Sequence, residues 1–251
     1  DLVKNEGIKY KGILTGKLRR YWDWKNITDI FLIILGFIQS FFSIIFNRPD
    51  IVFAKGGFVT VPYCLACSLL QVPFIIHESD AYIGLSNKIL SPFAKAVFLG
   101  FPIEVYGSRI NLKKSFFVGN PVRGDLLKKG LEKEDFFKKY GLNDKKKTVF
   151  LFGGSQGSGE INRLVNELIS KIVPKYNLIH QTGRDEESYF KEGFFDLEED
   201  DRKNYLVFGH IGEEMGDFMK NADLIISRAG ANSTAEIVAL RKISIIIPLC
   251  T

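Results

Sequence analysis

The sequence has few of the residues that mark disulfide-rich, metal-binding or nucleic-acid-binding proteins. It contains three cysteines and three histidines among 251 residues, and its net charge is only +5. Cys64 and Cys67 form a CxxC pair in an apolar run without a second pair, so we interpret both as small buried core residues on a helix. So few thiols fit a reducing compartment. No block of lysine and arginine resembles a nucleic-acid-binding arm, and we expect no metal, no other cofactor and no nucleic-acid partner.

One segment lacks charge altogether. Residues 30–46 read IFLIILGFIQSFFSIIF, and their few small or polar breaks form a narrow stripe at helical spacing with Asp29. A basic and aromatic cluster that includes Trp22 and Trp24 precedes this segment. The segment is slightly short for a membrane-spanning helix, which needs about 20 apolar residues. Three interpretations stay open: docking at a membrane interface, which the flanking cluster favours, an ordinary buried core helix, and a transmembrane span.

Short apolar runs alternate with helical stretches along the whole chain. Near-continuous apolar strands between helices are typical of parallel sheets that are covered on both faces. The polar, lysine-rich segment 124–147 contains no strand, but Phe136, Phe137 and Tyr140 indicate a helix. We therefore predict two doubly wound α/β domains, residues 1–123 and 124–251, in which ligands bind at the carboxyl ends of the strands. The strand-like runs are 51–57, 72–79, 96–100, 115–121, 147–154, 176–183, 204–211, 222–230 and 243–249.

A glycine-rich turn joins a strand to a helix in VFLFGGSQGS, residues 149–158. Glycines let the backbone approach a ligand closely, and the N–H groups at a helix start favour phosphate oxygens. The turn lacks the Lys-Ser/Thr pair of an ATP-binding P-loop. Anion binding is the favoured interpretation, and a purely structural turn is the alternative. The residues concerned are Gly153, Gly154, Ser155, Gln156 and Gly157.

A second such turn lies in LIISRAGANSTAEIVAL, residues 224–240, where polar side chains cluster at the expected start of a helix. Glu236 is expected in the first turn of that helix. A carboxylate there either stabilises the helix dipole or accepts hydrogen bonds from ribose hydroxyls. The second role is favoured, because a candidate phosphate loop lies in the same domain.

The predicted first domain has a glycine turn of its own in AKGGFVTVP, residues 54–62. Gly56 and Gly57 make it a candidate diphosphate cradle. HESDAYIGLSNK follows at 77–88, with His77 at the end of a strand. Such a histidine serves either as an acid–base group or as a structural hydrogen-bonding residue.

Five motifs together resemble those of the MurG-type glycosyltransferases. KGGFVTVP, HESDAYIGLSNK, GNPVR, GGSQGS and SRAGANSTAEI occur in the order and spacing of that family, over the whole chain. The resemblance implies a GT-B fold, in which two Rossmann-like domains face a cleft. It implies an inverting, metal-independent hexosyltransferase that moves N-acetylglucosamine from UDP-GlcNAc to lipid I, undecaprenyl-diphospho-MurNAc-pentapeptide. The product, lipid II, serves peptidoglycan synthesis, cell shape and cell division.

The resemblance also implies a place in the cell and a set of site residues. The enzyme is expected at the cytoplasmic face of the cell membrane as a peripheral protein, with Trp22, Trp24 and residues 30–46 on the anionic surface. Ile211 is expected to contact uracil through its backbone, and Glu236 to bind the ribose. The implied substrate-binding residues are Asp80, Arg123, Ser155, Ile211, Ala231, Asn232, Ser233, Thr234, Ala235 and Glu236.

Several positions depart from the family pattern. Asp80 stands where the family usually has Asn, and Asn232 and Ser233 replace a more usual Leu-Thr pair. The family's first strand and glycine loop, with the histidine proposed near the catalytic base, should precede Asp1. The stretch that grips the donor sugar should follow Thr251. We therefore expect both domains to be incomplete and the catalytic base to be absent from this chain, with His77 as a candidate substitute.

Two further functions stay open at this stage. One is a related GT-B glycolipid glycosyltransferase with another lipid acceptor, since fold alone does not identify the acceptor. The other is a non-catalytic, membrane-bound subunit that only binds a nucleotide sugar. The chain by itself is not expected to complete the transfer reaction.

Overall fold

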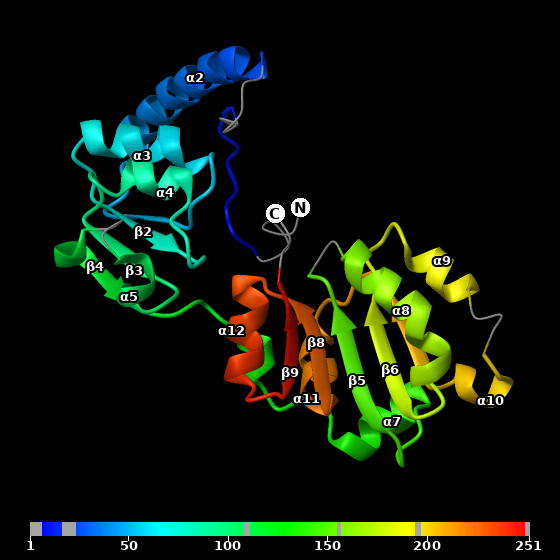
Figure 1. Ribbon diagram of the computed structural model, residues 1–251. Coiled ribbons are helices and arrows are strands. Elements are labelled where there is room, and N and C mark those ends of the chain that lie inside the picture. Colours follow the sequence, from blue (N-terminus) through cyan, green and yellow to red (C-terminus); the bar gives the residue numbers. More distant parts are fainter. Residues whose placement is uncertain (1–6, 17–23, 108–110, 155–156, 194–196, 249–251) are drawn as a thin grey trace. The chain divides into compact units, whose positions relative to one another are not determined.

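The computed structural model describes residues 7–16, 24–107, 111–154, 157–193 and 197–248, except the side chains of residues 25–27, 112 and 125 (Figure 1). The chain divides into two compact units, Asp1–Asn120 and Pro121–Thr251, which we call unit 1 and unit 2. This division falls three residues before the boundary expected from the sequence. Each unit is a parallel β-sheet with helices between its strands.

Unit 1 contains a four-stranded parallel sheet in the order β1-β2-β3-β4. Helices α3 and α4 cover one face of this sheet, and α2 packs against α3 (Figure 1). Ala54, Ile76 and Val97 point from the strands into the core beneath these helices. The elements are α2 (Lys25–Phe46), β1 (Val52–Ala54), α3 (Thr60–Leu69), β2 (Phe74–Glu78), α4 (Leu85–Leu90), β3 (Ala96–Leu99), α5 (Ile103–Tyr106), the 3-10 helix η2 (Leu112–Lys114) and β4 (Ser115–Phe117).

The CxxC pair belongs to this core, as predicted. Cys64 and Cys67 are buried, unbonded thiols on α3. Burial raises the pKa of Cys64 to about 12 and that of Cys67 to about 11. Since the thiolate is the reactive and metal-binding form, both residues act as small apolar side chains.

Unit 2 contains a five-stranded parallel sheet in the order β7-β6-β5-β8-β9. Alternate side chains of β5 enter two separate cores: Val149 and Leu151 pack with α8 and α9, while Phe150 and Phe152 pack with α7, α11 and α12. Both faces are therefore covered, as in a doubly wound fold. The elements are α6 (Gly124–Leu127), α7 (Lys133–Tyr140), β5 (Lys147–Phe152), α8 (Gly159–Ile172), β6 (Tyr176–Gln181), α9 (Glu187–Glu192), α10 (Glu199–Arg202), β7 (Tyr205–Phe208), α11 (Met215–Asn221), β8 (Leu224–Arg228), α12 (Ala231–Ala239) and β9 (Ser244–Ile247).

The predicted fold class is confirmed. Each of the strand-like runs of the sequence contains one observed strand, which is shorter than the run. The helix expected around Phe136 is α7, where Phe136 packs edge-on against Phe218 of α11. The apolar periodicity of the chain thus accounts for both sheets.

Helix α2 has three faces, and each has different surroundings. Phe37, Phe41 and Ile44 face the core of unit 1. The polar stripe faces an extended segment of the same chain, residues 8–16, whose backbone hydrogen-bonds to Gln39 through the N–H of Leu14 and the carbonyl of Gly12. A Cβ at Gly36 would lie 1.8 Å from the carbonyl oxygen of Leu14, so only glycine admits this approach. The stripe therefore serves a contact within the chain.

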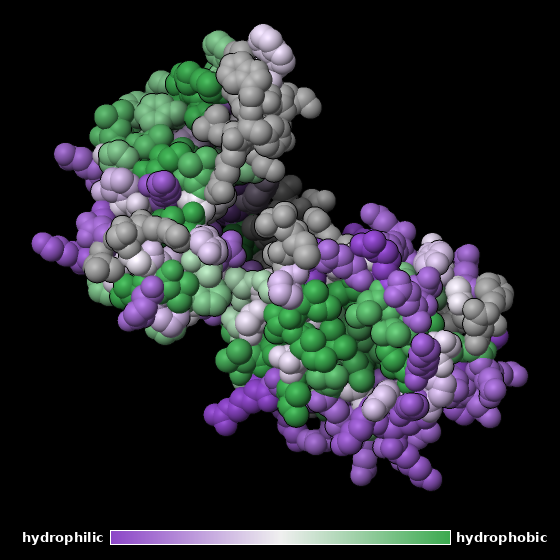
Figure 2. All heavy atoms as spheres, in the orientation of Figure 1, coloured by the Kyte–Doolittle hydropathy of each residue, from purple (hydrophilic) through white to green (hydrophobic). Residues whose placement is uncertain are grey.

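The third face of α2 is apolar and exposed, and Figure 2 shows hydrophobic side chains gathered over this part of unit 1. Residues 28–46 are long and apolar enough to cross a membrane, judged by length and composition alone, yet only 22% of that window is buried. An ordinary buried core helix is therefore not supported. Trp24 is exposed, and Trp22 lies outside the described residues. The exposed apolar side chains are Ile30, Phe31, Ile34, Leu35, Ile38, Phe42, Ile45 and Phe46.

Candidate functional site

The strand order of unit 2 places one crevice at the centre of its sheet. From β5 the chain proceeds outward through β6 and β7, and then returns to the other side of β5 with β8 and β9. In open parallel sheets ligands bind at such a reversal, outside the carboxyl ends of the strands. Here that point lies between β5, which leads into the turn 153–158, and β8, which leads into α12. The two glycine motifs of unit 2 therefore lie side by side.

The turn after β5 has a backbone that requires glycine. Gly154 and Gly157 have φ values of +88° and +79°. A Cβ at Gly157 would lie only 2.0 Å from the carbonyl oxygen of Thr182, so the loop lies directly against the end of β6. Ser158 caps α8, since its Oγ accepts from the N–H of Ile161 at 3.4 Å. A 14-residue helix thus starts at the crevice with its N–H groups toward it, which favours an anion. Ser155 and Gln156 lie outside the described residues.

A network of buried, hydrogen-bonded side chains packs against this loop. Asn162 donates from Nδ2 to the carbonyl of Thr182 at 2.9 Å, so its Oδ1 accepts from His180 Nε2, also at 2.9 Å. His180 Nδ1 then accepts from the Tyr205 hydroxyl at 3.0 Å. Gln181 adds a bond from Nε2 to the carbonyl of Gly154. These bonds hold the loop in one conformation and keep His180 neutral. None of the sequence motifs predicted this network of hydrogen-bonded side chains.

This arrangement predicts a loss of stability in mild acid. Burial lowers the pKa of His180 to about 4, whereas an unfolded histidine has its ordinary pKa near 6.5. Between these values the unfolded state binds the proton and the folded state does not, so stability falls as the pH falls from about 6.5 to about 4. The expected loss between pH 7 and pH 4.5 is about 2 kcal/mol. Urea unfolding at pH 7 and pH 4.5 measures it. His180→Gln should flatten this dependence, while His210→Gln, which removes an exposed histidine, should not.

Arg228 is the last residue of β8 and lies on the β8 side of the crevice. Its Nε is buried and has no hydrogen-bond partner among the described residues. A buried donor left unsatisfied costs about 1–3 kcal/mol, more when it is charged, so the position is suited to an incoming acceptor such as a phosphate oxygen. The sequence placed Arg228 in the motif but not among the binding residues. It lines a pocket of about 530 Å³ with Ser158, Gly159, Glu160, Arg163 and Glu186.

Two predicted site residues from distant parts of the sequence meet in unit 2. Arg123 Nε lies 3.2 Å from Glu236 Oε1, and their side chains are 42% and 13% exposed. The expected position of Glu236 in the first turn of its helix is wrong: α12 begins at Ala231, and its first turn has no acidic residue. Because the dipole effect falls off within the first turn, Glu236 has no dipole role, and a ligand role remains. Residues 231–236 are all at least partly accessible.

Ile211 lies in the loop after β7. Its side chain is only 5% exposed and packs in the core with Met215 and Phe218. Only its backbone is available to a ligand, which fits the kind of contact expected for it. The structure places it at the same carboxyl edge of the sheet as the glycine loop.

The candidate residues of unit 1 are organised by a buried carboxylate. Glu78 accepts from the N–H of Asp80 (3.1 Å), the N–H of Gly84 (2.7 Å) and Nδ2 of Asn87 (3.0 Å). It therefore fixes the loop that carries Asp80, whose pKa is raised by burial and by the neighbouring Glu78. The Gly56–Gly57 turn rests on Asn87, and both glycines have φ of +87°. The sequence alone did not indicate this role for Glu78.

His77 has no free ring nitrogen in this arrangement. It is 2% exposed, its Nε2 donates to the carbonyl of Gly119 at 3.0 Å, and its Nδ1 lies 3.3 Å from Lys55 Nζ. Burial lowers the pKa of His77, which favours the neutral ring. The geometry therefore does not favour His77 as the base that takes a proton from a substrate. Within the described residues, no group of three or more His, Cys, Asp or Glu side chains is placed to hold a metal ion.

Comparison with known proteins identifies the family of this chain. Residues 1–99 match the glycosyltransferase family 28 N-terminal domain, and residues 148–251 match the glycosyltransferase family 28 C-terminal domain. UDP-N-acetylglucosamine–N-acetylmuramyl-(pentapeptide) pyrophosphoryl-undecaprenol N-acetylglucosamine transferases are similar over 99% of this chain. That of Clostridium botulinum (strain Loch Maree) is 41% identical, and that of Clostridium perfringens (strain SM101) is 40% identical. The chain spans about two thirds of their length, 67% and 66%.

Solved structures show the same fold. The crystal structure of Acinetobacter baumannii MurG superimposes with a TM-score of 0.67 at 24% identity, over 99% of this chain and 66% of that chain. The UDP-GlcNAc 2-epimerase of Neisseria meningitidis, solved with UDP-GlcNAc bound, gives 0.62 at 14% identity, over 93% of this chain and 67% of that chain. At such identities these likenesses show the fold alone, and they confirm the predicted GT-B class. By its two domain matches and its relatives, this chain belongs to glycosyltransferase family 28, in the group of these N-acetylglucosamine transferases.

Proposed function

We propose that the protein transfers N-acetylglucosamine from UDP-GlcNAc to the lipid-linked acceptor lipid I, with unit 2 binding the donor. The observation that carries this proposal is the crevice between β5 and β8. There a glycine turn, the start of α8 and the buried Nε of Arg228 lie together, and α12, the helix that follows β8, carries Glu236 in its ion pair with Arg123. These groups complement a diphosphate joined to a ribose. The relatives at about 41% identity are named for the same donor sugar and acceptor.

Each part of the donor has a corresponding group. The N–H groups at the start of α8 and the Arg228 guanidinium would bind the diphosphate. Glu236 would accept from the ribose hydroxyls while Arg123 holds its carboxylate. The backbone of Ile211 would pair with uracil, and the accessible start of α12, residues 231–235, would contact the sugar. Asp80 of unit 1 is proposed as a further sugar contact.

The chemistry follows from this assignment. In an inverting transfer the acceptor hydroxyl attacks the anomeric carbon as a base removes its proton, and UDP leaves with the electrons of the broken C–O bond. Negative charge then grows on the departing diphosphate. Arg228 and the start of α8 are positioned to stabilise that charge, which is the largest kind of contribution a fixed site makes. The base stays unassigned.

The exposed face of α2 is proposed to dock on the membrane that carries the acceptor. Serine in place of Phe31, Leu35 and Phe42 should lower vesicle partitioning at least about 30-fold, since each of these side chains is about half exposed and burying a whole one contributes about 1.5–3 kcal/mol. Sedimentation with anionic vesicles measures this. A matched triple of exposed apolar residues in unit 2, Leu127, Tyr176 and Tyr189 to serine, should bind as the wild type does. Equal losses in both triples would contradict the proposal.

The direct test is transfer of labelled N-acetylglucosamine by the full-length protein to a lipid I analogue. UDP-GalNAc as donor and diacylglycerol as acceptor are the controls. Transfer from UDP-GlcNAc to lipid I alone is the expected result. Transfer to diacylglycerol would assign the protein to the glycolipid transferases, and donor binding without transfer to any lipid would favour a nucleotide-sugar-binding subunit.

A further inference from the structure

The loop between β7 and α11, residues 209–214, has a backbone that its own sequence does not fix. Gly209 and Gly212 flank the short segment that contains Ile211, and glycine has the least restricted backbone of all residues. Within the described residues, neither the N–H nor the carbonyl of Ile211 has a hydrogen-bond partner. Contacts at the two ends of the loop must therefore decide where these two backbone groups lie.

Tyr140 of α7 contacts both sides of the loop. Its ring centre lies 6.4 Å from that of Phe208, the last residue of β7, and 4.8 Å from that of Phe218 in α11. Its hydroxyl donates to Glu214 Oε1 at 3.0 Å, and Lys139 Nζ donates to the same oxygen at 2.6 Å. Lys139 and then Tyr140 lower the pKa of Glu214, so its carboxylate is ionised at neutral pH. One tyrosine thus connects the strand before the loop, the helix after it and the last residue of the loop itself.

The first residue of the loop is held from the other face of the sheet, which α9 covers. The carboxylate of Glu187 lies against Gly209, where an added Cβ would clash with Oε2. Lys191, 2.7 Å from Glu187 Oε1, and to a smaller extent the N–H of Gly209 lower the pKa of Glu187. The loop is therefore anchored at Gly209 by α9 and at Glu214 by α7, with Ile211 between the two anchors.

We infer that Tyr140, acting through Glu214, is the residue that positions loop 209–214 for the nucleobase of the donor. The inference rests on the proposed function, in which the backbone of Ile211 pairs with uracil. A backbone N–H and a carbonyl in fixed positions match uracil, which carries a carbonyl acceptor beside a ring N–H. Cytosine carries the reverse pattern, an amino donor beside an unprotonated ring nitrogen. The position of the loop thus contributes to the selection of the base.

Tyr140→Phe in the full-length protein tests this role, because it removes one hydroxyl and keeps the ring. The Kd for UDP, measured by calorimetric titration, should rise about 3- to 10-fold, the range expected for the loss of one hydrogen bond. The Kd for CDP should stay unchanged, so the preference for UDP over CDP should fall by the same factor. In transfer assays the KM for UDP-GlcNAc should rise while kcat stays the same. A merely structural role would weaken both nucleotides equally, since they share the ribose and the diphosphate.

Substitutions of Glu214 show whether the tyrosine acts through this carboxylate. Glu214→Ala should weaken UDP binding as Tyr140→Phe does, and Tyr140→Phe should have no further effect in that background. Glu214→Gln keeps an oxygen that accepts from the hydroxyl, so it should recover most of the affinity for UDP. The matched control is Tyr189→Phe. The hydroxyl of Tyr189 donates to Asn166 Oδ1 at 3.5 Å, between α9 and α8, and its loss should change neither Kd.

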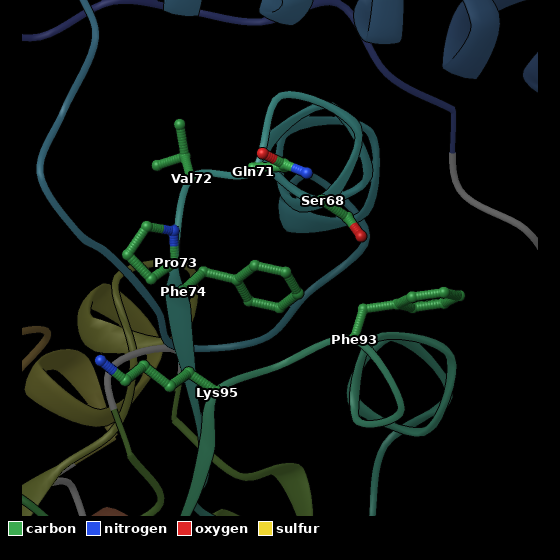
Figure 3. Close-up of a pocket in the computed structure, with 7 residues that line it drawn as sticks. All are labelled: Ser68, Gln71, Val72, Pro73, Phe74, Phe93 and Lys95. Carbon is green, nitrogen blue, oxygen red and sulfur yellow. The ribbon is translucent and has the colours of Figure 1, made fainter.

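The contribution of charge is measured with two lysines. The side chains of Lys139 and Glu214 are 46% and 50% exposed, so their ion pair should contribute little, and Lys139→Met should raise the Kd for UDP less than about 2-fold. Lys95 is an exposed lysine of unit 1 that lines a pocket of about 270 Å³ with Pro73 and Phe74, at the amino ends of β2 and β3 (Figure 3). Lys95→Met removes the same charge from the other unit and should leave both Kd values unchanged.

The outcomes separate this inference from the proposed function. An unchanged Kd for UDP in Tyr140→Phe, an equal rise in the Kd for UDP and CDP, or an equal effect of Tyr189→Phe would overturn the inference. Equal binding of UDP and CDP by the wild-type protein would contradict the uracil contact and the inference with it. Selective binding of UDP that depends on Tyr140, without sugar transfer to any lipid, would support the inference and contradict the proposed transfer reaction alone.

Discussion

Replacing Arg228 with alanine is expected to lower kcat/KM for sugar transfer by about 100- to 1000-fold, the range found when one preorganised donor to a developing anion is removed. The guanidinium stands at the end of β8, beside the start of α8, and its Nε is buried without a partner among the described residues. The leaving diphosphate would complete that hydrogen bond in the transition state. Transfer from labelled UDP-GlcNAc under subsaturating conditions measures the loss.

Two variants show whether geometry or charge alone matters. Arg228→Lys keeps the positive charge but loses the planar fork of donors, so it should recover only part of the activity. Arg163 lines the same pocket with an exposed side chain, and Arg163→Ala should change kcat/KM less than about 5-fold, as expected for an exposed charge. Equal losses at both positions would mean that Arg228 contributes only to the general potential of the pocket.

The strands were predictable because each one reads as a short apolar run, and β5 and β6 at the middle of unit 2 are buried on both faces. Their spatial order was not, since hydropathy does not say that β5 lies between β6 and β8. The crevice between β5 and β8 can therefore be located only when the strand order of the sheet is known. The glycine motifs predict turns that face a ligand, and this stays a prediction, but the ion pair of Arg123 with Glu236 depends on how the chain enters unit 2.

Two local features were misjudged or missed for definite physical reasons. Ser233 and Thr234 are good N-cap residues, yet α12 starts earlier, at Ala231, because Gly230 already has an extended backbone with φ −74° and ψ 134°. Glu236 therefore moves into the second turn. Similarly, the polar stripe of α2 is covered by residues 8–16, an extended segment whose place no periodicity could indicate.

Gly157→Ala is expected to abolish measurable donor binding, which we put at more than about a 100-fold loss. Two effects combine at this position. A φ of +79° costs an alanine about 1–2 kcal/mol, and its Cβ would lie 2.0 Å from the carbonyl oxygen of Thr182, an atom of the backbone. The loop must then move away from the end of β6. Its N–H groups would move away from the diphosphate with it.

Two other glycines serve as controls. Gly154 has a φ of +88° but open space around an added Cβ, so Gly154→Ala tests backbone strain alone and should weaken UDP-GlcNAc binding about 5- to 30-fold. Gly141, the C-cap of α7, also has a positive φ, +66°, and open space around an added Cβ. Gly141→Ala should therefore lower the free energy of unfolding by about 1–2 kcal/mol and leave donor binding unchanged. Calorimetric titration with UDP-GlcNAc and urea unfolding give both quantities. Equal losses of binding in all three variants would contradict a specific role of the loop, whereas the graded order 157, 154, 141 would mean that its fixed backbone holds the donor.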